Sequence, residues 1–166
     1  MTRQEAAEIY RTHSKAIYNT ALRIVRNPDE AEEIMQDTLM KFFSKGIPGL
    51  PVPKQAAWLR TTCIRMSIDT LRRRKKAMSV LEGLEADEAE EASDPDLPDT
   101  ALDVMRIREA MERMRYPYNL ILDLVLIEGL DYTEISRLTG QKEATLRSWY
   151  SRGRARLAKE LKAYTI

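Results

Sequence analysis

A stretch of 28 residues without a single cation divides this chain of 166 residues. Residues 77–104 contain ten Asp and Glu and no Lys or Arg. A segment with so much like charge cannot bury enough apolar surface to offset the conformational entropy lost on folding. We therefore expect residues 77–99 to form a flexible acidic linker, with a folded domain on either side of it.

The two flanking segments are both basic. Residues 1–76 carry a net charge of +7 and residues 105–166 carry +4, against −10 for the stretch between them, so the whole chain has a net charge of only +1. Charge segregated in this way is typical of proteins with a polyanionic partner. A solvated surface beside a disordered linker gives the same sums, so the sums alone do not choose between the two.

Both flanking segments are predicted to be helical, because apolar residues recur at helical spacing and no segment alternates as a strand does. Clusters of Gly and Pro, above all in residues 46–53, separate the helices. Helices are expected over about residues 3–25, from 28 onward, and over 55–76, 100–113, 117–128, 131–139 and 142–162. The predicted fold class is all-α: two small helical domains, residues 1–76 and 100–166, joined by a flexible acidic linker at residues 77–99.

Several functional classes find no support in the sequence. One Cys, at position 63, excludes an internal disulfide. The one His, at position 13, has no Cys or His nearby in the sequence, so the pattern supports neither a zinc site nor a nucleophile–base pair. No apolar run has the length of a membrane span, and the N-terminus lacks the apolar stretch of a signal peptide. We expect a cytoplasmic protein that is not an enzyme, uses no metal or cofactor and does not insert into a membrane.

The segment after Leu130 has the pattern of a helix-turn-helix. Asp131 and Glu134 are spaced as a reciprocal capping pair, and Gly140 ends the short helix. The helix that follows has a net charge of +5 over residues 142–162. In such a unit the second helix enters the major groove of DNA, where Arg recognises guanine and Ser or Lys contacts phosphates. A surface helix with scattered cations is the alternative.

Two helices of the first segment have polar faces of unusual composition. Between residues 55 and 76, Trp58 shares a largely cationic face with Thr61, Arg65, Asp69 and Arg72, which suits stacked bases and neutralised phosphates. Trp58 as a core residue is the alternative.

The second helix is expected to have Asn27 as its N-terminal cap, with Glu30 at the spacing of a reciprocal capping partner. This helix is expected to bury one face and to expose the opposite face. The expected core stripe is Ile34, Met35, Thr38, Leu39 and Phe42, and the opposite face contains Glu33, Gln36, Asp37, Met40 and Lys41. Met40 on this otherwise polar face either indicates a surface that binds another protein or is an isolated exposed residue without such a role.

The order and spacing of these motifs resemble the extracytoplasmic-function (ECF) type sigma factors of the bacterial sigma-70 family. The motifs NPDEAEEIMQDTLMKFF and AAWLRTTCIRMSIDTLRRRKK are similar to region two of that family. The motif LIEGLDYTEISRLTGQKEATLRSWYSRGRARLAKEL resembles its region four. The resemblance covers nearly the whole chain apart from the linker.

The resemblance implies a sigma factor that binds core RNA polymerase through its β and β′ subunits and directs it to promoter DNA for transcription initiation. Residues 1–76 would bind polymerase and the −10 element, and residues 100–166 the −35 element; an anti-sigma factor is a further implied partner. The loop at residues 46–55 stands where the family captures a flipped base. The implied polymerase-binding residues are Glu33, Gln36, Asp37, Met40 and Lys41. The implied −10 residues are Lys54, Gln55, Trp58, Thr61, Arg65, Arg72 and Arg73. The implied −35 residues are Thr145, Arg147, Ser148, Ser151, Arg152 and Arg154.

Two departures from the family pattern bear on the structure. The segment NLILDLVLI is unusually apolar, so that Leu120 and Val125 either add contact area for a partner or deepen the core. Gly153 lies inside the expected recognition helix, at a cost of up to about 1 kcal/mol relative to Ala. A stand-alone helix-turn-helix transcription regulator is the alternative function, but it has no need of the Gln36 and Asp37 motif.

Overall fold

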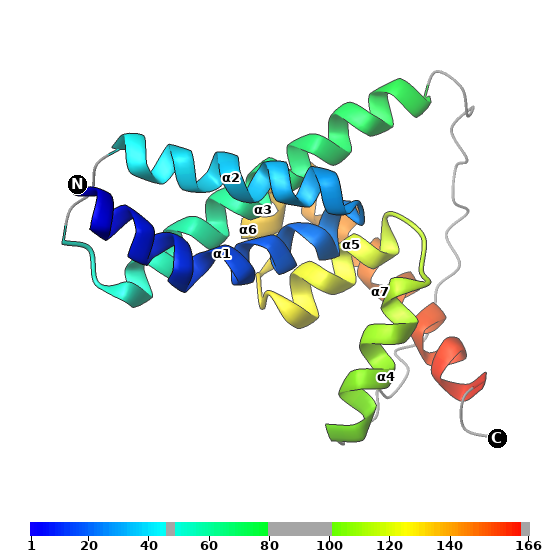
Figure 1. Cartoon of the computed structure of the whole chain (residues 1–166). Helices are drawn as coiled ribbons and strands as arrows, with labels where there is room; N and C mark the ends of the chain where they lie inside the picture. The colour runs from blue at the N-terminus through cyan, green and yellow to red at the C-terminus, as the bar shows by residue number, and fades with distance from the viewer. Residues whose placement is uncertain (46–48, 80–100, 164–166) are drawn as a thin grey trace. The chain divides into compact units, whose positions relative to one another are not determined.

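The chain forms two compact units, Met1–Glu85 and Ala86–Ile166, in a computed structural model that describes residues 1–45, 49–79 and 101–163 (Figure 1). All regular structure in these described ranges is helical, which confirms the predicted all-α class. From residue 80 onward the predicted linker lies outside the described residues, and its first three residues continue a helix of the first unit.

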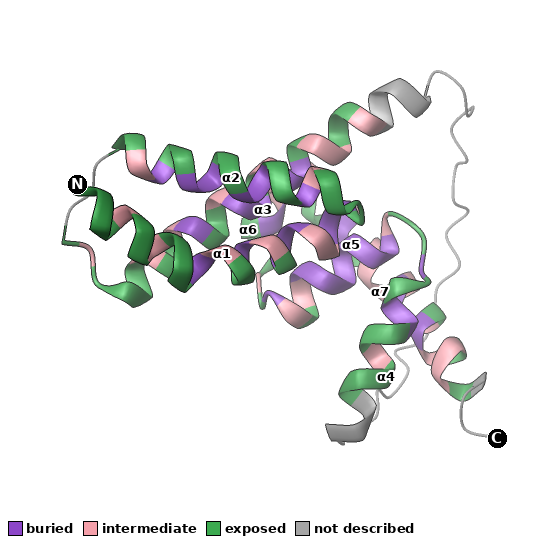
Figure 2. Cartoon of the chain, viewed as in Figure 1, coloured by how far each residue is buried: buried purple, intermediate pink, exposed green. Residues whose placement is uncertain are grey.

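Three long helices make up the first unit: α1 (Arg3–Val25), α2 (Pro28–Lys45) and α3 (Val52–Ser79). The helices α1 and α2 run antiparallel, and α3 packs against both (Figure 1). The apolar stripes of the three helices meet in one core, which Figure 2 shows as the buried side of each ribbon. Its most deeply buried side chains include Ala21, Leu39, Phe42, Leu59, Cys63 and Ile64.

A tight connection reverses the chain between α1 and α2. Arg26 adopts a left-handed conformation with φ of 56°, and its N–H donates to the Leu22 carbonyl at 2.8 Å. Asn27 then accepts a hydrogen bond from the Glu30 N–H at 3.0 Å, as the sequence predicted. In a reciprocal capping pair the Glu30 carboxylate would accept a hydrogen bond from the Asn27 N–H. Here that carboxylate pairs with Arg74 of α3 instead. The start of α2 is therefore tied to a distant helix as well as capped locally.

The third helix begins earlier than its sequence pattern predicted. It starts at Val52 instead of about Gln55, and the N–H groups of Lys54 and Gln55 both bond to the Pro51 carbonyl. Pro53 is compatible with this start because the first turn of a helix leaves its N–H groups unpaired in any case. Lys54 and Gln55 therefore belong to α3 and not to the loop before it.

The second unit contains α4 (Ala101–Glu112), α5 (Tyr118–Leu122), the π-helix η1 (Asp123–Ile127), α6 (Tyr132–Thr139) and α7 (Glu143–Ala163). The last helix packs against α4, α5 and α6. A single α-helix over residues 117–128 was expected, and this is wrong in its second half, where the backbone widens into η1. Leu120 is buried, so it deepens the core, whereas Leu126 is 40% exposed.

The helix-turn-helix forms as its sequence signals predicted. Both hydrogen bonds of the capping box between Asp131 and Glu134 are present. Gly140 ends α6 in a left-handed conformation with φ of 74°, and its N–H donates to the Ser136 carbonyl at 2.8 Å. The Ser136 hydroxyl in turn donates to the Gln141 carbonyl at 2.7 Å, which closes the turn before α7.

Gly153 has a packing role that its sequence position did not indicate. A Cβ at this position would lie 3.3 Å from Leu122 Cγ, and Leu122 is fully buried. The absence of a side chain lets α7 approach α5 closely, which accounts for a glycine inside a helix that it weakens by about 1 kcal/mol.

We expect Gly153→Val to lower the free energy of unfolding of the second unit by about 1–3 kcal/mol, because the branched side chain overpacks against Leu122. Urea titrations followed by Trp149 fluorescence in a Trp58→Phe background measure this unit. Helix propensity alone would make Gly153→Val more stable by up to about 0.5 kcal/mol, because valine is the better helix former of the two. Ala144→Val, at an exposed position of α7, is the control that measures the cost of a valine against alanine without the contact to Leu122, about 0.5 kcal/mol. A Gly153→Val protein as stable as the unchanged protein, or more stable, would contradict the packing role.

Candidate polymerase and nucleic-acid interfaces

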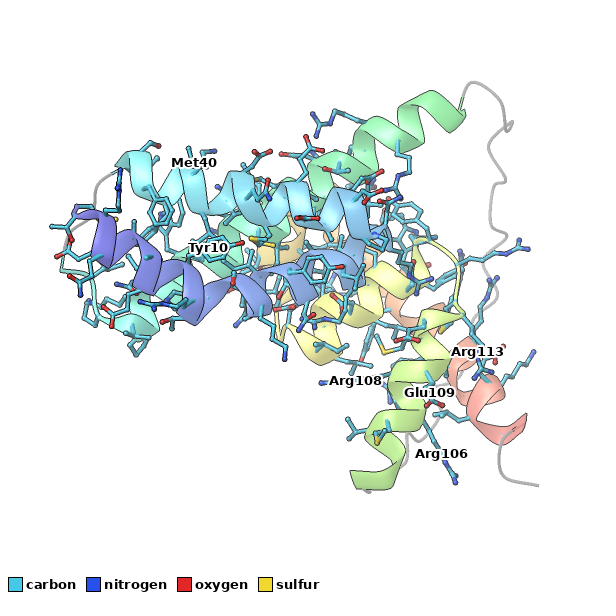
Figure 3. The ribbon with its side chains drawn as sticks, viewed as in Figure 1. Tyr10, Met40, Arg106, Arg108, Glu109 and Arg113 are labelled. Atoms are coloured by element: carbon cyan, nitrogen blue, oxygen red, sulfur yellow. The ribbon has the colours of Figure 1, made fainter. Side chains whose placement is uncertain are left out.

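The second helix divides into a buried face and a polar exposed face. The whole predicted core stripe of α2 is buried, together with Ala31. The opposite face is exposed at every predicted partner-binding position: Glu33, Gln36, Asp37, Met40 and Lys41. Met40, labelled on α2 in Figure 3, is 65% exposed although its neighbours on this face are polar or charged. An exposed flexible apolar side chain within a polar rim is typical of a surface that binds another protein.

A stripe of side chains follows one face of α3. At about 100° per residue, the spacing of these positions places them along a single line about 27 Å long. The stripe consists of Lys54, Trp58, Thr61, Arg65, Asp69 and Arg72. All but Trp58 are exposed, so the stripe offers three cations, a hydroxyl and one carboxylate along one side of the first unit. The carboxylate of Asp69 lies 3.8 Å from the Arg72 guanidinium, an exposed pair within one turn that leaves the stripe with a net positive charge.

The tryptophan of this stripe has one edge in the core. Trp58 is half-buried, and its ring lies 5.4 Å from the ring of the buried Phe42 at an interplanar angle of 65°. This edge-to-face contact fixes the indole on the helix surface. Packing and base stacking are therefore compatible roles for Trp58, because the core holds one part of the ring and leaves another part accessible.

Two of the predicted −10 residues lie off the stripe. Gln55 and Arg73 are turned about 100° away from Lys54 and Arg72, their neighbours on the stripe. The Gln55 amide donates to the Leu50 carbonyl at 2.8 Å, and its oxygen lies 3.1 Å from His13 Nε2. Because the amide nitrogen is the donor to Leu50, the amide oxygen accepts from His13. Gln55 thus connects the start of α3 to the buried histidine of α1.

The run of arginines at the end of α3 has divided roles. Arg74 donates to the Val25 carbonyl at 3.1 Å and pairs with Glu30, so it holds the α1–α2 connection against α3. Arg73 is exposed and donates to the Thr70 hydroxyl of its own helix at 3.4 Å. The sequence treated the run as one basic patch, but one of its members belongs to the fold.

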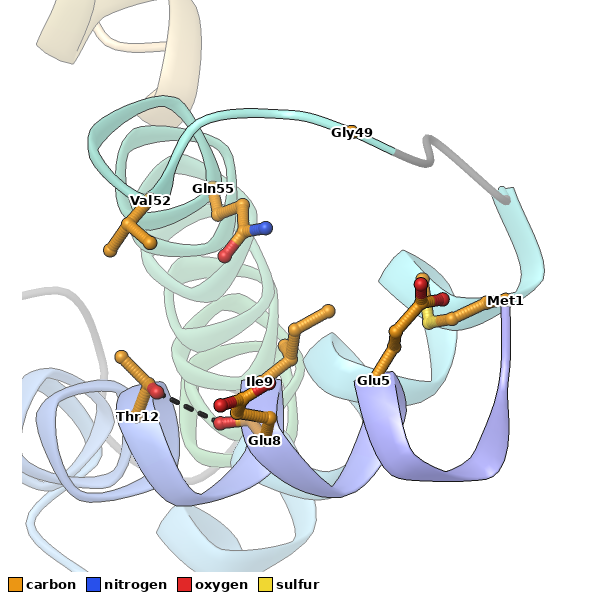
Figure 4. Close-up of a pocket in the computed structure, with 8 residues that line it drawn as sticks. All are labelled: Met1, Glu5, Glu8, Ile9, Thr12, Gly49, Val52 and Gln55. Atoms are coloured by element: carbon orange, nitrogen blue, oxygen red, sulfur yellow. Dashed lines mark hydrogen bonds between the residues drawn. The ribbon is translucent and has the colours of Figure 1, made fainter.

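A hollow of about 400 Å³ lies between the start of α1 and the start of α3 (Figure 4). Gly49, Val52 and Gln55 line it from the side of the proline-rich loop. Its other walls come from the first turns of α1: Met1, Glu5, Glu8, Ile9 and Thr12. Sequence analysis missed these residues, because nothing in the pattern of α1 shows that it packs beside the loop. The carboxylates make this hollow a poor site for an anion and a better one for hydrogen-bond donors.

The helix α7, predicted to be the recognition helix, exposes its predicted −35 residues unequally. Arg147 is exposed, while the others are half-buried: Thr145, Ser148, Ser151, Arg152 and Arg154. Arginines of α7 lie over tyrosine rings, at 5.4 Å for Arg147 on Tyr132 and 5.5 Å for Arg154 on Tyr150. Arg156 lies 4.2 Å from the ring of Tyr118 and so contacts α5. Three of the arginines of this helix therefore lie against aromatic rings, which favours defined positions for their guanidinium groups.

The described residues contain no cluster of three or more side chains suited to a metal ion. Within the same residues, no helix combines the length and the apolar character needed to cross a bilayer.

The chain matches two family models, Sigma-70 region 2 over residues 9–77 and Sigma-70, region 4 over residues 104–157. It is 28% identical to the ECF RNA polymerase sigma factor SigE of Mycolicibacterium smegmatis over 90% of this chain and 59% of that one. It is also 28% identical to the RNA polymerase sigma factor SigV of Bacillus subtilis, over 82% and 78% of the two chains. Among solved structures, the sigma factor RpoE in complex with the anti-sigma factor NepR from Bartonella quintana matches 98% of this chain and 97% of that one, with a TM-score of 0.53 and 22% identity. That last likeness concerns the fold.

We expect Arg74→Ala to lower the free energy of unfolding of the first unit by about 1–2 kcal/mol, because it leaves the Val25 carbonyl and the Glu30 carboxylate without their donor. Arg73→Ala, one position away, is the matched control and should change the free energy of unfolding by less than about 0.5 kcal/mol. Trp58 fluorescence in a Trp149→Phe background measures both variants in urea. A loss from Arg73→Ala as large as that from Arg74→Ala would refute the division of the arginine run.

Proposed function

This chain belongs to the ECF group of the sigma-70 family, and from that premise we propose that it binds core RNA polymerase and directs it to promoter DNA. The observation that best supports this function is the presence of both sigma regions, in order, on two compact units. Transcription initiation factors act by binding, so we propose no catalytic step for the chain.

The first unit offers two different surfaces for the two partners. We assign the exposed face of α2, which includes Met40, to polymerase, with Gln36 and Asp37 toward the clamp helices of the β′ subunit. The cationic stripe of α3 is assigned to the −10 element, where Trp58 stacks on an unpaired base and arginines neutralise phosphates. Because the α2 face and the α3 stripe belong to different helices, both partners are able to bind at once.

The hollow beside the proline-rich loop supports a role in holding a flipped −10 base. Its carboxylates accept hydrogen bonds, which suits the exocyclic amino group of cytosine or adenine. Gln55 supports the shape of this hollow through its bonds to Leu50 and His13. We therefore assign Gln55 to the wall of the hollow, where its contacts keep Gly49 and Leu50 close to α1.

The second unit supplies the −35 contacts through α7. We assign base recognition to Arg147, which is exposed, and phosphate contacts to the serines and to Arg152. Each unit alone has a small binding surface, but polymerase would hold the two at a fixed spacing and so raise the effective concentration of the second contact. With several cations at phosphates, promoter affinity should fall steeply with added salt.

The alternative function, a stand-alone helix-turn-helix regulator, does not account for the first unit. Such a protein needs neither the exposed face of α2 nor a second cationic surface on α3. An anti-sigma factor is a further proposed partner, and the exposed Leu126 beside α5 is where added apolar contact area is available. Val125 is half-buried and Leu120 lies in the core, so they contribute little to such a contact.

We expect the purified chain to bind bacterial core polymerase and to support run-off transcription from a pool of promoter templates. Met40→Glu should weaken polymerase binding at least about tenfold, because it places a charge where an apolar side chain is buried by the partner. Binding is measured by fluorescence anisotropy of labelled protein with core polymerase.

Lys15→Glu, an exposed charge reversal on α1, is the control and should bind as the unchanged protein does. If Met40→Glu binds polymerase normally, the polymerase surface lies elsewhere. If the unchanged chain neither binds polymerase nor yields any transcript, the proposed function is wrong.

A further inference from the structure

The first turn of α6 contacts the first turn of α7 through two adjacent residues. The ring of Tyr132 lies under the Arg147 guanidinium at 5.4 Å. The hydroxyl of Thr133 donates to a carboxylate oxygen of Glu143 at 3.2 Å. Both contacts reach side chains at the start of the helix assigned to DNA, so α6 determines how that helix presents its charged groups.

Without these contacts, Glu143 and Arg147 would face each other. They are four residues apart on α7, with the acid toward the N-terminus, which is the favourable order for an ion pair within a helix. The structure shows a different arrangement, because Thr133 holds the carboxylate and Tyr132 holds the guanidinium. Arg147 therefore keeps its N–H groups available for a nucleic acid.

The contact with Tyr132 is compatible with base recognition by Arg147, because it can leave the guanidinium N–H donors available. A guanidinium that lies parallel to a ring uses its flat face for the cation–π contact and leaves its five N–H donors pointing outward in the guanidinium plane. A stacked arginine can still make the bidentate hydrogen bonds that identify guanine in the major groove. Because its rotamer is already restricted, it also loses less conformational entropy on binding.

The contact extends into a cluster on one flank of α7. The ring of Tyr132 meets that of Tyr150 edge to face, with centroids 6.3 Å apart at 71°. Arg154 lies over the ring of Tyr150 at 5.5 Å. At about 100° per residue, Arg147, Tyr150 and Arg154 share that flank, so the two tyrosines form a continuous support for two arginines. We call these four residues the tyrosine–arginine cluster.

From this geometry we propose that Tyr132 and Thr133 are positioning residues for promoter recognition: Tyr132 sets the orientation of Arg147, and Thr133 withholds Glu143 from it. The proposal rests on the proposed function in one respect, the assignment of α7 to −35 DNA. Neither residue needs to touch DNA, because each acts through a side chain of α7.

The stacking itself is measured in the full chain without any partner. We expect the Arg147 Nε–Hε signal in the ¹⁵N NMR spectrum to be shifted by the ring current of Tyr132. Tyr132→Leu should move it toward the position of an ordinary exposed arginine, and Tyr132→Phe, which keeps a ring, should retain the shift. An Arg147 signal that is the same in the leucine variant as in the unchanged protein would refute the stacking.

The consequence for recognition is measured in holoenzyme, with bacterial core polymerase and promoter templates randomised in the upstream element. Sequencing of the transcripts gives a base preference at each position, and Arg147→Ala identifies the positions that Arg147 recognises. At those positions we expect Tyr132→Leu to reduce the preference about two- to five-fold, the equivalent of one exposed cation–π contact. Thr133→Val should reduce it at the same positions, because the released Glu143 pairs with Arg147.

Three comparisons separate positioning from general loss of structure. Tyr132→Phe should restore the preference that Tyr132→Leu loses. Tyr132→Leu combined with Arg147→Ala should lose no more than Arg147→Ala alone, because the tyrosine acts through the arginine. Tyr116→Leu removes a comparable ring contact, with Trp149 at 6.4 Å, and should leave the preference at these positions unchanged.

The possible failures are distinguishable. A base preference in Tyr132→Leu equal to that of the unchanged protein, or losses that add in full to those of Arg147→Ala, would overturn the positioning role while transcription by the unchanged holoenzyme still upholds the sigma factor function. Absence of transcripts with the unchanged protein would instead overturn the proposed function, and with it the role of the cluster in promoter recognition.

Discussion

The constraint on which this structure depends is that α2, α3 and α7 must each bury one face in a core and keep the face assigned to a partner exposed. Each unit is too small to cover its functional helices with a further layer, so one face of α2, α3 and α7 is the core and the opposite face is the available surface. A helix permits this because its side chains repeat every 3.6 residues. Leu39 and Phe42 are buried on the helix that exposes Met40, one residue from Leu39 and two from Phe42. Changes to the core of such a helix therefore also move its ligand face.

Local signals in the sequence predicted most of the helices and failed where distant parts of the chain meet. The capping box of Asp131 and Glu134, the turn at Gly140 and the buried stripe of α2 depend on residues within one or two turns, so a periodic pattern reveals them. His13, which bonds to Gln55, and Val25, which bonds to Arg74, lie 42 and 49 residues away from them in sequence, and no local pattern indicates either contact. The π-helix η1 was missed for a related reason, because its apolar residues suit an α-helix equally well and the packing around it decides the geometry.

The positions of individual arginines explain why net charges alone could not distinguish a surface for a polyanionic partner from an ordinary solvated surface. Arg73 and Arg74 are neighbours of identical type, yet one is exposed and the other bonds to Val25 and Glu30. On α7, Arg156 and Arg147 are both exposed, but Arg156 lies over Tyr118 of α5 and Arg147 over Tyr132 of α6. Arginine can stack, form bidentate hydrogen bonds and stay charged, so the same residue type serves packing and nucleic-acid contact. Only the position of each guanidinium distinguishes the two uses.

The start of α6 combines a local capping motif with contacts to charged side chains of another helix. Asp131 and Glu134 cap the helix by bonding to each other's backbone N–H groups, a local device that fixes the conformation of the residues between them. Those residues are Tyr132 and Thr133, the two that contact Arg147 and Glu143 of α7. A cap ordinarily contributes about 1 kcal/mol to stability. Here the same hydrogen bonds also orient a ring and a hydroxyl toward the helix assigned to DNA. Loss of the cap should therefore reduce the precision with which Arg147 is presented, even where the core around Ile135 keeps α6 folded.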